Sequence, residues 1–137
     1  MTLQRRWIFA VALALATTGV ALAQTSPAAQ LDHDQLQSRL QQGGKLLVLD
    51  VRTAEEFAAG HVPGAVNIPR GLVEFRIWKQ VGFPANPDTN RPVYLQCQNG
   101  NRASLAAQSL AELGFTNTTA VVMSFDEWQQ AGHPLVK

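Results

Sequence analysis

The alternation of short apolar runs with segments of helical spacing is the feature of this 137-residue chain that most restricts its fold. The runs have the length of short strands and lie at residues 46–49, 65–68, 93–96 and 119–122. Helical patterns occur at residues 31–41, 54–59, 73–80, 103–113 and 125–130. Strands that alternate with helices predict a parallel sheet flanked by helices on both faces. We therefore expect an α/β fold.

The composition fits one domain of ordinary proportions. With 46% hydrophobic and 15% charged residues, the chain has enough apolar material for one core. We expect this domain to span residues 31–137, after a short flexible lead-in at residues 24–30 that contains Pro27. No repeat or low-complexity segment divides the sequence.

Residues 1–23 have the features of a signal peptide. Arg5 and Arg6 precede the apolar run Trp7–Ala16, and small residues around Ala23 suit cleavage. The alternative is an uncleaved membrane anchor, but polar residues interrupt the run before the roughly 20 apolar residues that a bilayer span needs. We therefore expect cleavage near Ala23 and a periplasmic or otherwise exported protein with no stable membrane anchor.

The charge balance gives no reason to expect nucleic acid as a partner. Cleavage near Ala23 would remove two of the 11 basic residues and none of the 10 acidic ones, which leaves a formal net charge of −1. A nearly neutral protein has no electrostatic attraction for nucleic acid or for an anionic membrane.

Cys97 is the single cysteine of the sequence, so the chain can form no internal disulfide. Such a residue is an incidental small buried hydrophobe, a partner in a disulfide between chains, or a chemically reactive group. Cys97 directly follows the run at residues 93–96 and precedes a helical segment. This places it at the carboxyl end of a predicted strand, where ligands bind in parallel sheets.

The segment from Cys97 to Arg102, here called the Cys97 loop, has the composition of an anion-binding turn. Between its two ends stand four uncharged residues: Gln98, Asn99, Gly100 and Asn101. Inward-pointing amides backed by a helix N-terminus hold anions, and the same field favours a thiolate. Arg102 adds planar donors suited to an oxyanion. The loop is therefore expected to hold or attack an anionic substrate.

At three places the sequence resembles the rhodanese domain family, and the resemblance covers nearly all of residues 31–137. The matching segments are the Cys97 loop; Asp50-Val51-Arg52-Thr53 with Glu56-Phe57 and the run Gly60–Pro69; and Trp128, Ala131-Gly132 and Pro134. The match between Asp50 and Pro69 is long and specific.

The resemblance implies a sulfurtransferase that needs no metal or organic cofactor. Cys97 would be catalytic, taking sulfane sulfur from thiosulfate or a polysulfide and passing it from a persulfide to a thiol or cyanide. Gln98 to Arg102 would bind the substrate. The alternative is a persulfide carrier that turns over little by itself and delivers sulfur to an acceptor protein.

A third interpretation is a phosphatase-like oxyanion site. Related phosphatases of this fold carry one more residue between cysteine and arginine, and they carry histidine where Gln96 stands. Four intervening residues favour sulfur over phosphate. The uncharged loop also attracts a dianion such as thiosulfate weakly, so that a polysulfide or an organic persulfide is an alternative donor.

Five further residues are weighed for roles near the site. Asp50 and Arg52 end the first predicted strand, and we expect Asp50 to bond loop amides or to pair with Arg52 in support of the loop. His61 is expected to make a local hydrogen bond in a turn. His33 and His133 lack metal-ligand spacing, so no metal site is predicted.

Overall fold

The structure is a computed structural model that describes residues 29–122 and 124–137. The strands are β1 (Ala29–Leu31), β2 (Leu47–Asp50), β3 (Val66–Asn67), β4 (Val93–Gln96) and β5 (Thr118–Val121). The helices are α1 (His33–Gln42), α2 (Ala54–Ala59), α3 (Val73–Gln80), α4 (Asn101–Glu112) and α5 (Phe125–Gln130), with a 3-10 turn η1 (Arg70–Leu72) before α3.

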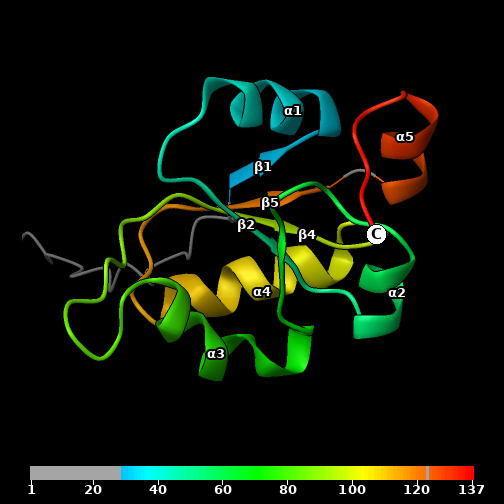
Figure 1. Cartoon of the computed structure of the whole chain (residues 1–137). Coiled ribbons are helices and arrows are strands. Elements are labelled where there is room, and N and C mark those ends of the chain that lie inside the picture. The colour runs from blue at the N-terminus through cyan, green and yellow to red at the C-terminus, as the bar shows by residue number, and fades with distance from the viewer. Residues whose placement is uncertain (1–28, 123) are drawn as a thin grey trace, which may run out of the picture.

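Within these residues the five strands form one sheet in the order β1-β5-β4-β2-β3. All neighbouring strands run parallel. Figure 1 shows α1 and α5 on one face of the sheet and α3 and α4 on the other, with α2 beside the end where α4 begins. The α/β fold with helices on both faces is thus confirmed. Because the strands are parallel, their carboxyl ends meet at the edge beside α2.

The two faces of the sheet bury separate apolar cores, since successive strand residues point to opposite faces. Leu49 of β2 packs in the core beneath α3 and α4, while Val48 packs in the core beneath α1 and α5. In the second core Leu36 and Trp128 are both 0% exposed. The sheet is therefore packed on both faces, and the loops at its carboxyl edge start from buried strands.

Local side-chain caps mark where three of the helices, α1, α2 and α5, begin. The Thr53 hydroxyl accepts from the Glu56 amide and the Glu56 carboxylate accepts from the Thr53 amide, so the expected capping box of α2 is present. Asp32 and Gln35 make the same exchange at α1. That helix therefore begins at His33, and the expected start at Leu31 is two residues early.

The first strand corrects the expected start of the domain. Ala29 and Gln30, which the sequence analysis assigns to a flexible lead-in, belong to β1 and pair with Thr119 and Ala120 of β5. The rest of the lead-in and the predicted signal peptide lie outside the described residues. Among the helices that the structure does describe, none has the length and apolar character needed to cross a membrane.

Candidate active site

The Cys97 loop connects β4 to α4 at the carboxyl edge of the sheet (Figure 1). Asp50, the last residue of β2, is in register with Gln96, so the end of β2 lies directly beside the start of the loop. α4 begins at Asn101, two residues before the expected start at Ala103. Arg102 therefore belongs to the first turn of the helix, and the turn that carries the chemistry is shorter than the sequence analysis predicts.

The Cys97 thiol is 1% exposed and lies among backbone donors. Its Sγ accepts from the amide of Gly100 at 3.0 Å and from the amide of Ala103 at 3.4 Å. Both amides belong to the turn that opens α4, so the partial positive charge of the helix N-terminus adds to their effect. Such an environment suits a sulfur atom that carries negative charge.

Gly100 gives the loop its shape. Its φ of 89° lies in the left-handed region that favours glycine. A Cβ at this position would lie 2.8 Å from the Cα of Val122, which is too close for any side chain. The loop therefore turns against the end of β5, and this turn aims the Gly100 amide at the sulfur.

The remaining loop amides form an open anion cradle. Within the described part of the chain, no acceptor faces the backbone amides of Gln98, Asn99 and Arg102. The amide of Asn101 donates to its neighbour Asn99 at Oδ1 over 3.3 Å. Amides that lack an acceptor among the described residues, in the same loop as a buried sulfur, can bind further negative charge.

Helix α5 holds the front of the loop in place. The Phe125 amide donates to the Gln98 carbonyl at 2.7 Å, and the Gln98 side chain donates to Asp126 Oδ1 at 3.2 Å. The Gln98 side chain is thus engaged with α5, and only its backbone amide remains for a ligand.

Arg102 is bound by Glu56, a contact that the sequence analysis missed. Its Nη1 and Nη2 donate to Glu56 Oε2 and Oε1 at 2.8 and 2.9 Å, in a bidentate ion pair. The hydrogen bond from Arg102 lowers the pKa of Glu56 to about 2, and the same bond raises the pKa of Arg102. The sequence shows Glu56 only as a helix cap, and its separation of 46 residues from Arg102 carries no local signal.

Asp50 and Arg52 form a buried ion pair beneath the loop, which is one of the two arrangements expected for Asp50. Arg52 Nη2 donates to Asp50 Oδ2 and to the Gly60 carbonyl, both at 2.7 Å. The Arg52 guanidinium also lies 4.0 Å over the ring of Phe125, whose amide holds the loop. The pair thereby links the ends of β2, α2 and α5.

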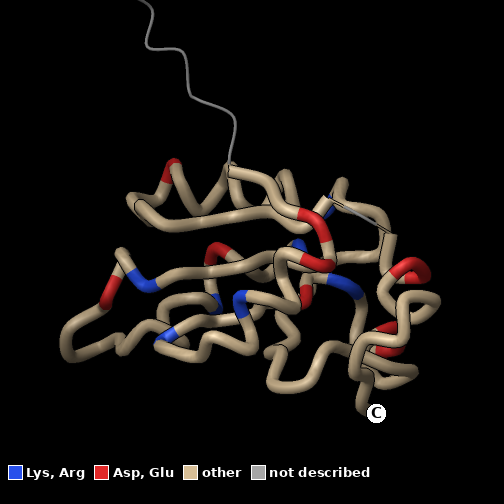
Figure 2. The backbone as a smooth tube through the Cα atoms, turned by 90° about the horizontal axis from the view of Figure 1, so that it is seen from above, with Lys and Arg blue, Asp and Glu red and all other residues tan. Residues whose placement is uncertain are grey.

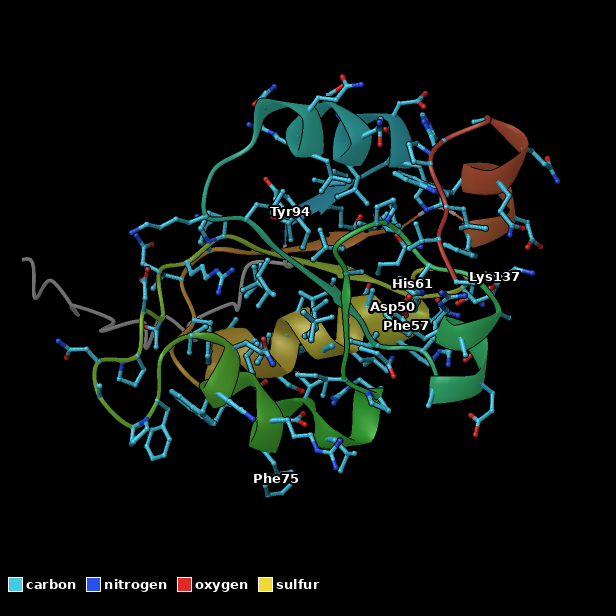
Figure 3. The ribbon with its side chains drawn as sticks, viewed as in Figure 1. Asp50, Phe57, His61, Phe75, Tyr94 and Lys137 are labelled. Atoms are coloured by element: carbon cyan, nitrogen blue, oxygen red, sulfur yellow. The ribbon has the colours of Figure 1, made fainter. Side chains whose placement is uncertain are left out.

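The histidines lie outside this cradle. His61 Nδ1 bonds the Phe57 carbonyl at 2.8 Å and its ring stacks on Phe57, so it makes the local hydrogen bond that was predicted. Figure 3 shows both side chains at the end of the molecule that also holds Asp50. His33 and His133 lie at the interface of α1 with α5. In residues 29–122 and 124–137, no three metal-binding side chains gather at one place.

A cavity of about 600 Å³ lies elsewhere, between α1 and the sheet. Arg39 and Tyr94 line it, and Figure 3 shows Tyr94 well away from Asp50. Cys97 and Arg102 are not part of its lining. This cavity is therefore separate from the Cys97 loop.

Comparisons with known proteins show the family of the chain. A family model for the rhodanese-like domain matches residues 32–131. "Thiosulfate sulfurtransferase 16, chloroplastic" from Arabidopsis thaliana is 33% identical over 99 residues, covering 63% of this chain and 76% of that protein. "Putative sulfur carrier protein YrkF" from Bacillus subtilis (strain 168) is 37% identical over 84 residues, 61% of this chain but only 41% of that protein.

A solved structure shows the same architecture. The polysulfide-sulfur transferase homodimer from Wolinella succinogenes superimposes with a TM-score of 0.66 at 26% identity. The match covers 80% of this chain and 79% of that one. The fold, the loop geometry and the family match lead to one conclusion: the chain belongs to the rhodanese-like domain family.

Proposed function

We propose that this protein is a sulfurtransferase that moves sulfane sulfur through a persulfide on Cys97. The observation that carries the proposal is the position of Sγ, which accepts from two backbone amides beside an open anion cradle. A persulfide is anionic, and it extends the side chain by one S–S bond of about 2.05 Å. The outer sulfur would then meet the unpaired amides of the loop.

The reaction needs no outside oxidant or reductant. The Cys97 thiolate attacks the outer sulfur of thiosulfate, a new S–S bond forms, and sulfite leaves with the electron pair of the broken bond. With a polysulfide the leaving group is the shortened polysulfide. A thiol or cyanide then attacks the outer sulfur of the persulfide, and the Cys97 thiolate is restored.

The loop residues have distinct roles in this scheme. The amides of Gln98, Asn99 and Arg102 hold the outer sulfur or the donor, as preorganised donors hold developing charge. Gly100 and Asn101 shape the turn and the start of α4. The Arg102 guanidinium is held by Glu56, while Asp50 and Arg52 support the loop through Phe125.

Turnover of sulfur from thiosulfate to cyanide tests this function. The wild type is expected to form thiocyanate steadily, and Cys97→Ser is expected to form none, because an alkoxide is not available as the nucleophile. Ser104→Ala is the control, since its hydroxyl lies beyond the loop and should leave the rate near that of the wild type. Equal rates in the wild type and in Cys97→Ser would rule the proposal out.

A persulfide carrier is the second candidate. The relative named as a sulfur carrier and the burial of Cys97 to 1% favour it. A carrier would load one sulfur per Cys97 but release it only to a particular acceptor protein. Stoichiometric loading with negligible thiocyanate formation would identify this case.

Export remains part of the proposal. The amino-terminal features of residues 1–23 support cleavage near Ala23 and a periplasmic or otherwise exported protein. Amino-terminal sequencing of the secreted protein tests this, and an intact Met1 on the purified protein would contradict it.

A further inference from the structure

Two ion pairs lie at the Cys97 loop, Arg102 with Glu56 and Arg52 with Asp50. Arg102, the single cation of the loop, uses both Nη atoms on the carboxylate of Glu56. Asp50 and Arg52 neutralise one another beneath it. A donor that reaches Cys97 therefore meets backbone amides, while both Nη atoms of Arg102, the cation of the loop, are already bound to Glu56.

The pair between Glu56 and Arg102 is held from a second side. Glu56 Oε2 also accepts from the amide of Thr53 at 2.8 Å, as part of the cap of α2. The cap therefore holds the carboxylate at the start of α2 independently of its contact with Arg102. An incoming anion would have to displace a charge-assisted bidentate contact to gain the guanidinium for itself.

An acidic group also stands beside the loop. Asp126 Oδ1 accepts from the side chain of Gln98. Figure 2 shows acidic positions along the side of the molecule near the C-terminus, which is the end that holds the loop. Two negative charges on one small donor are repelled more than one charge, since repulsion scales with the product of the charges.

We propose that Glu56 selects the sulfur donor by occupying Arg102, so that the site favours an organic persulfide with one negative charge over the dianion thiosulfate. This inference rests on the proposed sulfurtransferase or carrier function. The Cys97 thiolate attacks the outer sulfur of the organic persulfide and forms a new S–S bond. The S–S bond of the donor breaks, and the organic thiolate leaves with its electron pair.

The test measures how fast Cys97 gains sulfur from two donors of different charge. Cysteine persulfide is the singly charged probe and thiosulfate is the doubly charged one. Loading is followed by intact mass in single-turnover samples of the purified protein. The wild type is expected to load faster from cysteine persulfide than from thiosulfate.

Glu56→Gln is the diagnostic variant. Glutamine still accepts from the Thr53 amide and preserves the helix cap, but it releases the charge of Arg102. Thiosulfate loading should rise about tenfold, the size expected when a charged hydrogen-bonding partner becomes available, while cysteine persulfide loading stays within about twofold. Glu55→Gln changes the net charge equally one residue away and should leave both rates unchanged.

The outcomes separate the two proposals. Faster wild-type loading from thiosulfate, or a fall of thiosulfate loading in Glu56→Gln, would overturn the selectivity role of Glu56 while leaving the persulfide chemistry intact. Equal effects of Glu55→Gln and Glu56→Gln would overturn it as well, because the effect would then be one of net charge. If neither donor loads the wild type, the proposed function fails together with this inference.

Discussion

At the scale of single residues, Gly100 is the position of the loop at which an added side chain is least tolerated. Its backbone has a φ of 89° and approaches the Cα of Val122 so closely that a Cβ would lie 2.8 Å away. Gly114 has a similar φ of 94° but no atom within 4 Å of a Cβ position. A comparison of substitutions at the two glycines therefore separates the cost of backbone strain from the cost of steric overlap.

Gly100→Ala is expected to lower the free energy of unfolding by about 3 kcal/mol, because strain and overlap act together. Gly114→Ala, the matched control, should cost about 1 kcal/mol through strain alone. Urea denaturation of both variants measures the difference. Equal losses in the two variants would show that the contact with Val122 does not restrict the loop.

Glu56 links the stability of the site to pH. Its pKa is about 2 in the folded protein against an ordinary value of 4.5, because Arg102 hydrogen-bonds to the ionised form. The unfolded chain therefore takes up a proton before the folded one does as the pH falls through this range. The stabilisation from the pair is present above pH 4.5 and is lost progressively between 4.5 and about 2.

We expect the stability difference between the wild type and Glu56→Gln to be constant near neutral pH and to shrink below pH 4.5. Chemical denaturation at a series of pH values measures it, with Glu55→Gln as the control for net charge. A difference that does not change down to pH 2.5 would mean that the ion pair contributes nothing to folding.

At the scale of elements, the contact between α1 and α5 contains an unusual buried group. His33, the first residue of α1, is 3% exposed, and neither of its ring nitrogens has a partner among the described residues. Its ring meets Trp128 of α5 edge to face at 5.6 Å. Burial lowers the pKa of His33, against the raising influence of nearby carboxylates such as Glu127.

This pKa direction predicts that acid loosens the interface. Below the ordinary pKa of 6.5 the unfolded chain binds a proton on His33 that the folded protein takes up only at lower pH, so stability falls as the pH drops from 6.5. His33→Phe should remove this part of the pH dependence in thermal denaturation between pH 7.5 and 5. His61→Gln, outside the interface, serves as the control, and an unchanged slope in His33→Phe would refute the account.

Elements with a strong local signal were predictable from the sequence. The ranges of α2, α3, α5 and β4 agree with the structure because caps, prolines and periodicity define them locally. The start of α4 was not predicted, because its first turn lies inside the polar loop and is fixed by contacts with Cys97. The ion pair of Glu56 with Arg102 was also missed, because only the fold brings α2 and α4 together.

At the scale of the whole molecule, the alternation of strands and helices was sufficient to predict a parallel sheet, but not its first strand. β1 has three residues, of which only Leu31 is buried. The sequence therefore shows no apolar run that would predict this strand. It forms because β5 offers an edge to pair with. The same assembly places the Cys97 loop, α2 and α5 at one edge of the sheet, and the sulfur chemistry proposed for this family member depends on that arrangement.

The intact mass of the protein tests the central claim most directly. The purified protein is incubated with thiosulfate or a polysulfide and measured before and after a thiol reductant, beside Cys97→Ser. We predict a gain of one sulfur atom that the reductant reverses and that the variant lacks. No gain with either donor, or an equal gain in Cys97→Ser, would contradict the assignment of Cys97 as the sulfur-carrying residue.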